Sequence, residues 1–530
     1  MKRDRRAPRP WPLIALASAV VLSLLVGMAA LGPHRAANIA LAASSNILID
    51  GLNERIPAHR IRVVELEVDP NDLAALNADL PWSGGEVKAA TLIDKGIRYP
   101  AKFRYRGVYA TTHFLGGKKS FRLNLKKDNP FSPYRRLNFI NPKAFNMVND
   151  HLALWIAGRM GVPVPYDDFA FVRINGVDVG VMEVFEQVDK DFERNRHIGD
   201  HSVAVFKGDY PPVTGRELPK PLALWTDAAH WEYVGGGDSA LAHQRLNALV
   251  DVVRSKKLSA EQKRDSLPKL IDIDAFLRYY AALKVINTSH IDDFHNQWLV
   301  LSPRTGLFYP VLWDPLMMYP HRDEPLHPVH DALSKLVLMD PEWRLRCDRQ
   351  VAEGIALLRT DGLFEKHLDQ VADRLQPSVL RDRNKYGQVS PDPADVHGTS
   401  FAHWTHSLTS LQRTALAYWG KVAAELKDVQ ADAVIHGNTV QVTAQGPNAF
   451  TVELQVDSAG ELPQVVGAYH TLGWSPDASN GDKVPQVTIV PRLLAPDSAH
   501  TGLHAADRPY IVTITLPNGT LRKATIIPVP

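Results

Sequence analysis

The chain has 530 residues, of which 45% are hydrophobic and 22% are charged, an ordinary composition for a globular protein. This length favours two or more domains. The formal net charge of +2 gives no indication of a nucleic-acid partner, and a single cysteine, Cys347, excludes an intramolecular disulfide.

The first 45 residues carry an export signal. The basic residues Lys2, Arg3, Arg5, Arg6 and Arg9 precede residues 11–32, which are uncharged and mostly apolar. This stretch is close to the ~20 residues that cross a bilayer, and its basic flank predicts a cytoplasmic N-terminus. A cleaved signal peptide, with small residues near 40–43, is the alternative. Both predict an extracytoplasmic protein, at the periplasm or cell surface. The length favours a retained single-pass anchor in the inner membrane.

The next part of the chain is rich in strand patterns. Alternating apolar residues predict strands over 62–68, 88–93, 97–105 and 120–125, with a short helix over 70–76. Together they indicate a mostly antiparallel sheet. Lys118 and Lys119 follow Gly116-Gly117, a pair that either approaches a phosphate or forms an ordinary hairpin turn, and the hairpin is favoured.

A helix and a hairpin follow. The pattern predicts a helix over 150–160, then strands over 169–174 and 179–185 joined by Asn175-Gly176, a pair typical of tight hairpin turns. Glu186 comes after the hairpin, and residues 187–194 have a helical pattern. A strand over 202–206 leads to Lys207. Residues 209–237 read as a long loop rich in Pro and Gly, and residues 238–267 as helical.

Residues 271–320 hold the most informative pattern in the chain. Phe276, Tyr279, Tyr280, Leu283 and Ile286 recur at helical spacing. Polar residues then lead into two predicted strands, 297–301 and 307–313, which are separated by a turn at 302–306. An Asp/Asn cluster therefore precedes a short two-stranded ribbon, and Asp314 follows it.

This arrangement is typical of phosphoryl-transfer sites. In such sites one Asp orients or deprotonates the attacking hydroxyl, while an Asn and a second Asp hold Mg²⁺. Asp292, Asp293, Asn296 and Asp314 supply these residue types. Mg²⁺ needs only one or two carboxylates because phosphate and water complete its shell. Turn formation or helix capping is the alternative role for the same side chains.

The remaining sequence predicts a helical tail and a separate β-module. Amphipathic helices are expected over 341–358, 362–375 and 401–427, and short alternating strands begin after residue 428. These strands predict a small β-sandwich at 429–530, a kind of module that contacts partners in the cell envelope. The fold class is therefore α+β, with a main domain at 46–428 followed by the sandwich.

Several short segments, in this order, resemble the spore-coat CotH kinase family over about residues 60–425. The segments are 104–107, 118–125, 161–165, 175–176, 180–186, 205–208, 293–296 and 308–314. The resemblance implies an atypical, reduced protein-kinase-like fold with antiparallel sheets and a helical lobe. It also implies ATP and Mg²⁺ as cofactors, and a protein substrate with a Ser or Thr hydroxyl.

The resemblance also implies roles for individual residues. Asp293 would face the attacking hydroxyl, with Asp292 as the alternative. Asn296 and Asp314 would ligate Mg²⁺. The nucleotide-binding residues would be Lys207, with Lys119 as its alternative, and Glu186.

Two positions depart from the family pattern. Leu316 occupies the place of a second acidic residue, and Val108-Tyr109-Ala110 replaces a polar segment after Arg106-Gly107. The Leu316 departure and the C-terminal β-module motivate an alternative function, a non-catalytic envelope or coat assembly protein built on a degenerate kinase-like fold.

Overall fold

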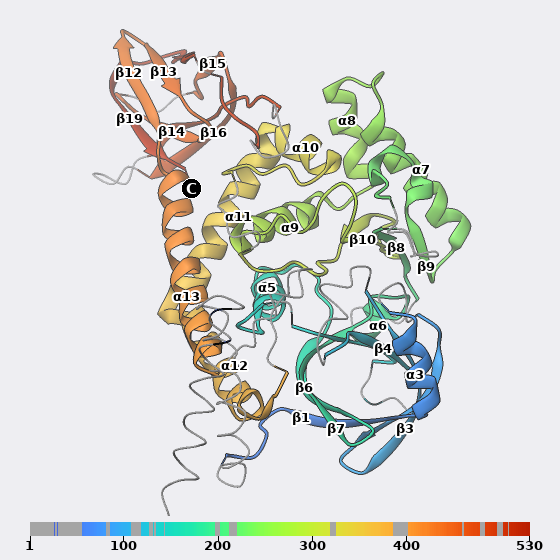
Figure 1. Cartoon of the computed structure of the whole chain (residues 1–530). Coiled ribbons are helices and arrows are strands. Elements are labelled where there is room, and N and C mark those ends of the chain that lie inside the picture. The colour runs from blue at the N-terminus through green and yellow to red at the C-terminus, as the bar shows by residue number, and fades with distance from the viewer. Residues whose placement is uncertain are drawn as a thin grey trace, which may run out of the picture.

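The computed structural model describes most of the chain after residue 55 (Figure 1). The described residues are 26, 29, 56–80, 85–107, 118–126, 131, 134–142, 144–196, 202–210, 220–318, 325–384, 401–457, 461–476, 483–495, 502–506 and 508–529. The expected membrane or signal segment lies almost entirely outside these residues. Within them, no helix is both long and apolar enough to cross a membrane.

The N-terminal half forms a closed seven-stranded barrel, which occupies the lower right of Figure 1. Its strands are β1 (Arg62–Val68), β2 (Lys88–Asp94), β3 (Ile97–Tyr105), β4 (Phe121–Leu125), β5 (Arg136–Ile140), β6 (Asp167–Ile174) and β7 (Val177–Glu186). Helix α3 (Pro70–Ala78) connects β1 to β2. The pairs are antiparallel except for β1 with β6, which run parallel and close the barrel.

Every second residue along most barrel strands is buried, and these side chains fill the interior of the barrel. Leu66, Phe103, Leu123 and Leu137 are fully buried and belong to one apolar cluster, while their strand neighbours point outward. The β6–β7 turn contains Asn175-Gly176, both with positive φ, as a tight primed hairpin turn requires.

A second sheet lies between the barrel and the helices. Its strand order is β11-β10-β8-β9, from β8 (Ala204–Gly208), β9 (Glu232–Gly235), β10 (Gln297–Leu301) and β11 (Phe308–Pro310). The apolar helix predicted before the ribbon is α9 (Ile273–Ile286), which packs against α5 (Asn149–Arg159) and α11 (Pro341–Arg359). Asp272 caps its first turn, and Asn287 ends it in a left-handed conformation.

The other helices complete the main core. They are α6 (Phe192–Asn195), α7 (Ser239–Arg254), α8 (Ala260–Ser266), α10 (Ala332–Met339), α12 (Leu363–Arg381) and α13 (Phe401–Glu425). In Figure 1, α13 runs along the side of the molecule from α12 to the C-terminal strands.

The C-terminal strands form two four-stranded sheets around one apolar core. The strands are β12 (Gln430–His436), β13 (Thr439–Gln445), β14 (Phe450–Val456), β15 (Gln464–Val466), β16 (Tyr469–Pro476), β17 (Lys483–Val490), β18 (Tyr510–Thr515) and β19 (Leu521–Pro528). The sheets have the orders β12-β13-β18-β15 and β16-β17-β14-β19.

The α+β class is confirmed, and several details are corrected. The expected antiparallel sheet is a closed barrel with one parallel pair. Residues 187–194 were expected to be helical, but the helix is only α6, because Gln187 continues the β-ladder through its N–H to the carbonyl of Arg136. The second ribbon strand is also shorter than expected, since Val311 is the last residue to donate into the ribbon, to Trp298.

Candidate functional site

The site is built around the β10–β11 ribbon, which brings the loop before β10 next to the turn after β11. The two strands pair antiparallel, with Leu301 opposite Phe308 and Leu299 opposite Pro310. The loop starts at Asn287, where α9 ends, and reaches β10 at Gln297. Pairing of the strands therefore places residues far apart in sequence at one end of the ribbon.

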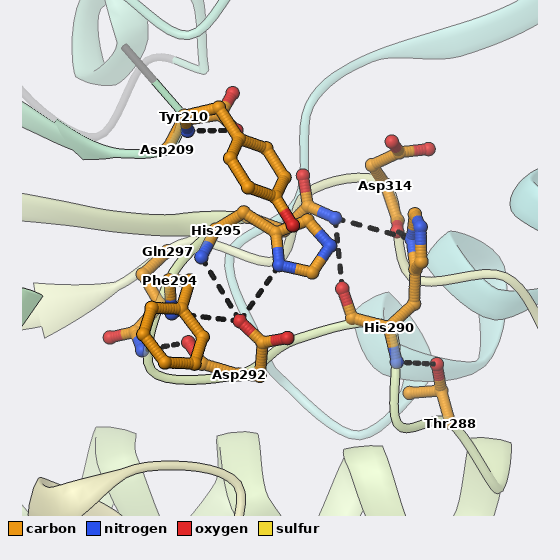
Figure 2. A network of polar contacts seen from close by, with 10 residues as sticks. Asp209, Tyr210, Thr288, His290, Asp292, Phe294, His295, Gln297 and Asp314 are labelled. Carbon is orange, nitrogen blue, oxygen red and sulfur yellow. Dashed lines mark hydrogen bonds and ion pairs between the residues drawn. The ribbon is translucent and has the colours of Figure 1, made fainter. Parts of the chain in front are cut away.

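His290 links the loop before β10 to the turn after β11 (Figure 2). Its Nδ1 lies 2.6 Å from the backbone oxygen of Asp314, and its own carbonyl accepts a 2.8 Å hydrogen bond from Asn296 Nδ2. A carbonyl only accepts, so Nδ1 of His290 carries the proton. The two residues expected to hold Mg²⁺, Asn296 and Asp314, are thus joined through one histidine.

Asp292 and His295 form a second hydrogen-bonded pair in the same loop. Asp292 Oδ1 accepts from His295 Nδ1 at 2.8 Å, and also from the backbone N–H groups of Phe294 and His295 at 2.8 and 3.1 Å. The Tyr210 ring lies 5.0 Å from the His295 ring, and the His290 ring lies 5.3 Å from it. Figure 2 shows this compact group of rings and carboxylates.

The pair stabilises its charged form. Burial disfavours charge on both groups, but the hydrogen bonds that Asp292 receives from His295 and the backbone outweigh this, and the pKa of Asp292 falls below its usual value. Burial alone would lower the pKa of His295. The hydrogen bond to the Asp292 carboxylate and the negative charges of Asp292, Asp209 and Asp314 outweigh burial, so the pKa of His295 is raised above 6.5.

Asp293 faces a different element from Asp292. Its Oδ1 accepts a 2.9 Å hydrogen bond from the N–H of Ala332 at the start of α10, and its carbonyl accepts from Leu224 N at 2.8 Å. Burial raises the pKa of Asp293. The structure therefore brings Asp292 together with Asn296 and Asp314, and directs Asp293 towards α10.

The turn after β11 has an unusual backbone. Asp314, Leu316 and Met318 have φ of 51°, 47° and 56°, a region that costs energy for residues other than glycine. The N–H of Leu316 donates to Asp150 Oδ1 at 3.0 Å, and that of Met318 donates to the carbonyl of Ile286 at 3.0 Å. Leu316 is 5% exposed, so the position of the family's second acid is occupied by a buried side chain.

The residues expected to bind nucleotide are dispersed. Lys207 Nζ lies 3.0 Å from Asp209 Oδ2 and 3.8 Å from Glu232 Oε2, which neutralise its charge. Buried Glu186 accepts from Asn195 and Arg196, each at 2.7 Å, so it fastens α6 to the barrel. Lys119 is half-buried just before β4, and this burial lowers its pKa.

Sequence reasoning assigned no role to four contributors to this region: His290, His295, Asp150 and Arg106. The negative charges of Asp314 and Asp209 raise the pKa of Arg106 against the effect of burial, so Arg106 lies near the ribbon. It also lines a small pocket together with Trp313 and Asp314. In the sequence, the Arg-Gly motif at 106–107 could have indicated Arg106, and the Asp-x-x-His spacing at 292–295 could have indicated His295.

These groups suit a metal ion that takes most of its ligands from elsewhere. Among the described residues, no cluster of three or more His, Cys, Asp or Glu side chains is arranged to hold a metal. Asp314 and Asn296 supply one carboxylate and one amide. Such a set fits Mg²⁺, which keeps several waters and binds phosphate oxygens, and would not by itself form an all-protein cage.

The fold and this region define an α+β protein with carboxylate, imidazole and amide groups at one end of a β-ribbon. Residues 103–415, more than half of the chain, match the family model described as CotH kinase protein. The chain is also 24% identical over 339 residues to the inner spore coat protein H of Bacillus subtilis (strain 168), covering 61% of this chain and 90% of that protein. The chain therefore belongs to the CotH kinase protein family.

Proposed function

We propose that this protein is an exported atypical kinase that transfers the γ-phosphoryl group of ATP to a Ser or Thr hydroxyl of a protein, with Mg²⁺. The observation that carries the proposal is the hydrogen-bonded group at the end of the ribbon, where Asn296 and Asp314 are joined through His290 and the Asp292–His295 pair lies alongside. Membership of the CotH kinase protein family supports the reaction class.

Each side chain then has a role in keeping with its contacts. Asp314 and Asn296 would hold Mg²⁺, which would bring the phosphates of ATP to the site. Asp292 keeps His295 in one tautomer and orientation, and this pair would accept the hydroxyl proton of the protein substrate. Asp293 is the alternative proton acceptor. Its hydrogen bond to the start of α10 favours a structural role.

A transfer assay tests the proposal. The purified full chain would be incubated with labelled ATP, Mg²⁺ and a mixture of Ser- and Thr-containing peptides. Asp314→Ala is expected to lower incorporation by at least about 100-fold, because the site works mainly by electrostatic stabilisation. Asp251→Ala, which removes a carboxylate exposed on α7, is the matched control and should retain activity. Equal incorporation by wild type and Asp314→Ala would exclude this role for Asp314.

The two neighbouring aspartates are separable in the same assay. Asp292→Asn is expected to lower kcat with little change in KM for ATP, whereas Asp293→Asn should mainly lower thermal stability. The reverse pattern would transfer the proton-accepting role to Asp293.

Leu316 favours a second candidate function. A buried leucine in place of a carboxylate removes a negative charge from the expected metal site. A non-catalytic assembly protein of the envelope or coat is consistent with that loss, and the Bacillus subtilis relative is named a spore coat protein. This alternative predicts no rise in Tm with Mg²⁺ and ATP, whereas the kinase predicts a clear one.

The proposed location follows the N-terminal sequence and the relative. A basic, then apolar N-terminus predicts export, and the relative's name places that protein in a spore coat. Attachment to the membrane through residues 11–32 and an envelope partner for the C-terminal sandwich remain parts of the proposal. Blotting of membrane and soluble fractions separates a retained anchor from a cleaved signal.

A further inference from the structure

An arginine cluster faces outward from the barrel where β3 pairs with β4. Arg104 and Arg122 are direct cross-strand partners in this antiparallel pair. Side chains in such positions point to the same face, with Cβ atoms about 5 Å apart, and like charges there repel. Arg106 follows two residues after Arg104, and its N–H continues the ladder to the carbonyl of Ser120 at 3.0 Å. The three arginines therefore share one side of the barrel.

None of the three guanidinium groups forms an ion pair with a carboxylate in the described part of the chain. Arg122 Nε donates to the neutral amide oxygen of Asn138, at 2.8 Å. Arg98 on the same strand is paired with Glu67, and Arg136 on β5 lies 3.3 Å from Asp189. Within the part of the chain that the structure describes, the lack of a carboxylate in direct contact thus distinguishes these three arginines from Arg98 and Arg136.

The electrostatic cost of this arrangement is visible in Arg122. Burial lowers its pKa well below the usual value, and the positive charges of Arg106, Arg104 and Arg136 lower it further. Like charges at direct cross-strand positions lower stability, and a bound anion would relieve this repulsion.

The cluster borders the candidate site. Burial lowers the pKa of Arg106 too, while Asp314 and Asp209 oppose this effect. Its guanidinium lies 5.9 Å from the centre of the Trp313 ring, in the pocket that Asp314 also lines. Lys207, the lysine first expected to hold phosphates, is already neutralised by Asp209 and Glu232.

We propose that Arg104, Arg106 and Arg122 form a binding site for an oligophosphate, supplied by the triphosphate of the nucleotide donor. This deepens the proposed function and rests on it for the identity of the donor. Guanidinium groups bind phosphate oxygens by paired, charge-assisted hydrogen bonds, and several adjacent phosphates would neutralise all three arginines at once.

Binding of inorganic tripolyphosphate to the full chain, without Mg²⁺ and with a chelator present, tests this site apart from catalysis. Titration calorimetry is expected to show binding to the wild type, weakened at least about tenfold in Arg104→Gln and in Arg122→Gln. Arg98→Gln, on the same strand but ion-paired to Glu67, should bind like the wild type. Without ligand, both cluster variants should have a Tm equal to or above that of the wild type, because a repulsion is removed.

The possible outcomes distinguish the oligophosphate-binding site from the proposed kinase activity. Unchanged affinity in both cluster variants, or no binding to the wild type, overturns the proposal. Tripolyphosphate binding that is lost in these variants supports the site even if no phosphoryl transfer from ATP is found. In that case the proposed kinase activity is rejected and the oligophosphate site is retained. A phosphoserine peptide that binds as tightly as tripolyphosphate would assign the cluster to a phosphorylated protein and overturn the oligophosphate assignment.

Discussion

Single residues in this protein carry contacts that decide both charge and backbone shape. Asp150 is the clearest case, because it lies in the first turn of α5 and accepts the N–H of Leu316 in the strained turn after β11. Left-handed conformations of residues other than glycine cost about 1–2 kcal/mol each and persist only where surrounding contacts hold them. Asp150 is therefore expected to keep Asp314 in place.

Replacing Asp150 tests that dependence. Asp150→Ala leaves the buried N–H of Leu316 without its acceptor and should lower the free energy of unfolding by about 1–3 kcal/mol. Asp150→Asn keeps an acceptor oxygen and should cost less. Urea denaturation measures both, and equal losses in the two variants would show that the carboxylate charge, and not this hydrogen bond, matters.

The Asp292–His295 pair predicts a pH dependence. Because the folded pKa of His295 is above 6.5, its contribution to stability is complete below pH 6.5 and is lost as the pH rises through the folded pKa. The pKa of Asp292 is lowered, so its contribution is lost only in acid, as the pH falls below 3.8. The stabilisation by the pair is therefore largest between these limits.

A pH series of unfolding measurements checks this. The difference in the free energy of unfolding between wild type and His295→Gln should shrink from about pH 6 to about pH 9. His406→Gln, at an exposed position on α13, is the matched control for the loss of a histidine. A His295→Gln difference that grows with pH would contradict the raised pKa.

At the scale of elements, a buried ion pair fastens α12 to the barrel. Lys118 Nζ lies 2.5 Å from Asp382 Oδ2, with neither side chain exposed, and the same carboxylate accepts from Val181 N at 2.9 Å. Gly180 makes this approach possible, since a Cβ at that position would overlap the Asp382 carboxylate. The pair holds the end of α12 against β7.

Removing one partner should be costly. Lys118→Met leaves the Asp382 carboxylate buried without its cation and is expected to lower the free energy of unfolding by about 3–5 kcal/mol. The double variant Lys118→Met/Asp382→Asn keeps an acceptor for Val181 and removes the buried charge, so it should recover part of the loss. Chemical denaturation of both variants decides; no recovery in the double variant would mean that the lysine acts through packing alone.

At the scale of the whole molecule, the C-terminal sandwich is joined to the main domain by more than one segment. The buried guanidinium of Arg344 on α11 donates to the carbonyl of Pro491, and Tyr469 donates to Glu342 at 3.1 Å. Leu493 and Leu503 belong to the core of the main domain. The sandwich is therefore expected to unfold together with the domain that carries the site.

Limited proteolysis tests this coupling. Arg344→Ala removes the buried donor to Pro491 and should increase cleavage in the segment between α13 and β12, seen by mass spectrometry. Arg349→Ala, at an exposed position on the same helix, is the matched control. Equal cleavage of both variants and the wild type would show that the remaining contacts suffice to hold the sandwich.

Local patterns in the sequence predicted much of the fold. Strands β1, β3 and β10 have the expected bounds, and the Asn175-Gly176 turn lies where its residue types require. These elements depend on alternation, propensity and backbone stereochemistry, which act over a few residues. The family resemblance was also carried by short segments, and the family is confirmed.

Only the tertiary structure decided what depends on contacts between distant segments. Closure of the barrel requires β1 to pair with β6, more than a hundred residues later, and no local pattern specifies that pairing. The same holds for the different elements that Asp292 and Asp293 face, for the ion pair of Lys207, and for the adjacent arginines across β3 and β4, which contact no carboxylate within the described residues. The sequence determined which chemical groups were available and which strands would carry them. Packing determined which of them meet, because charge and hydrogen bonding act through space and not along the chain.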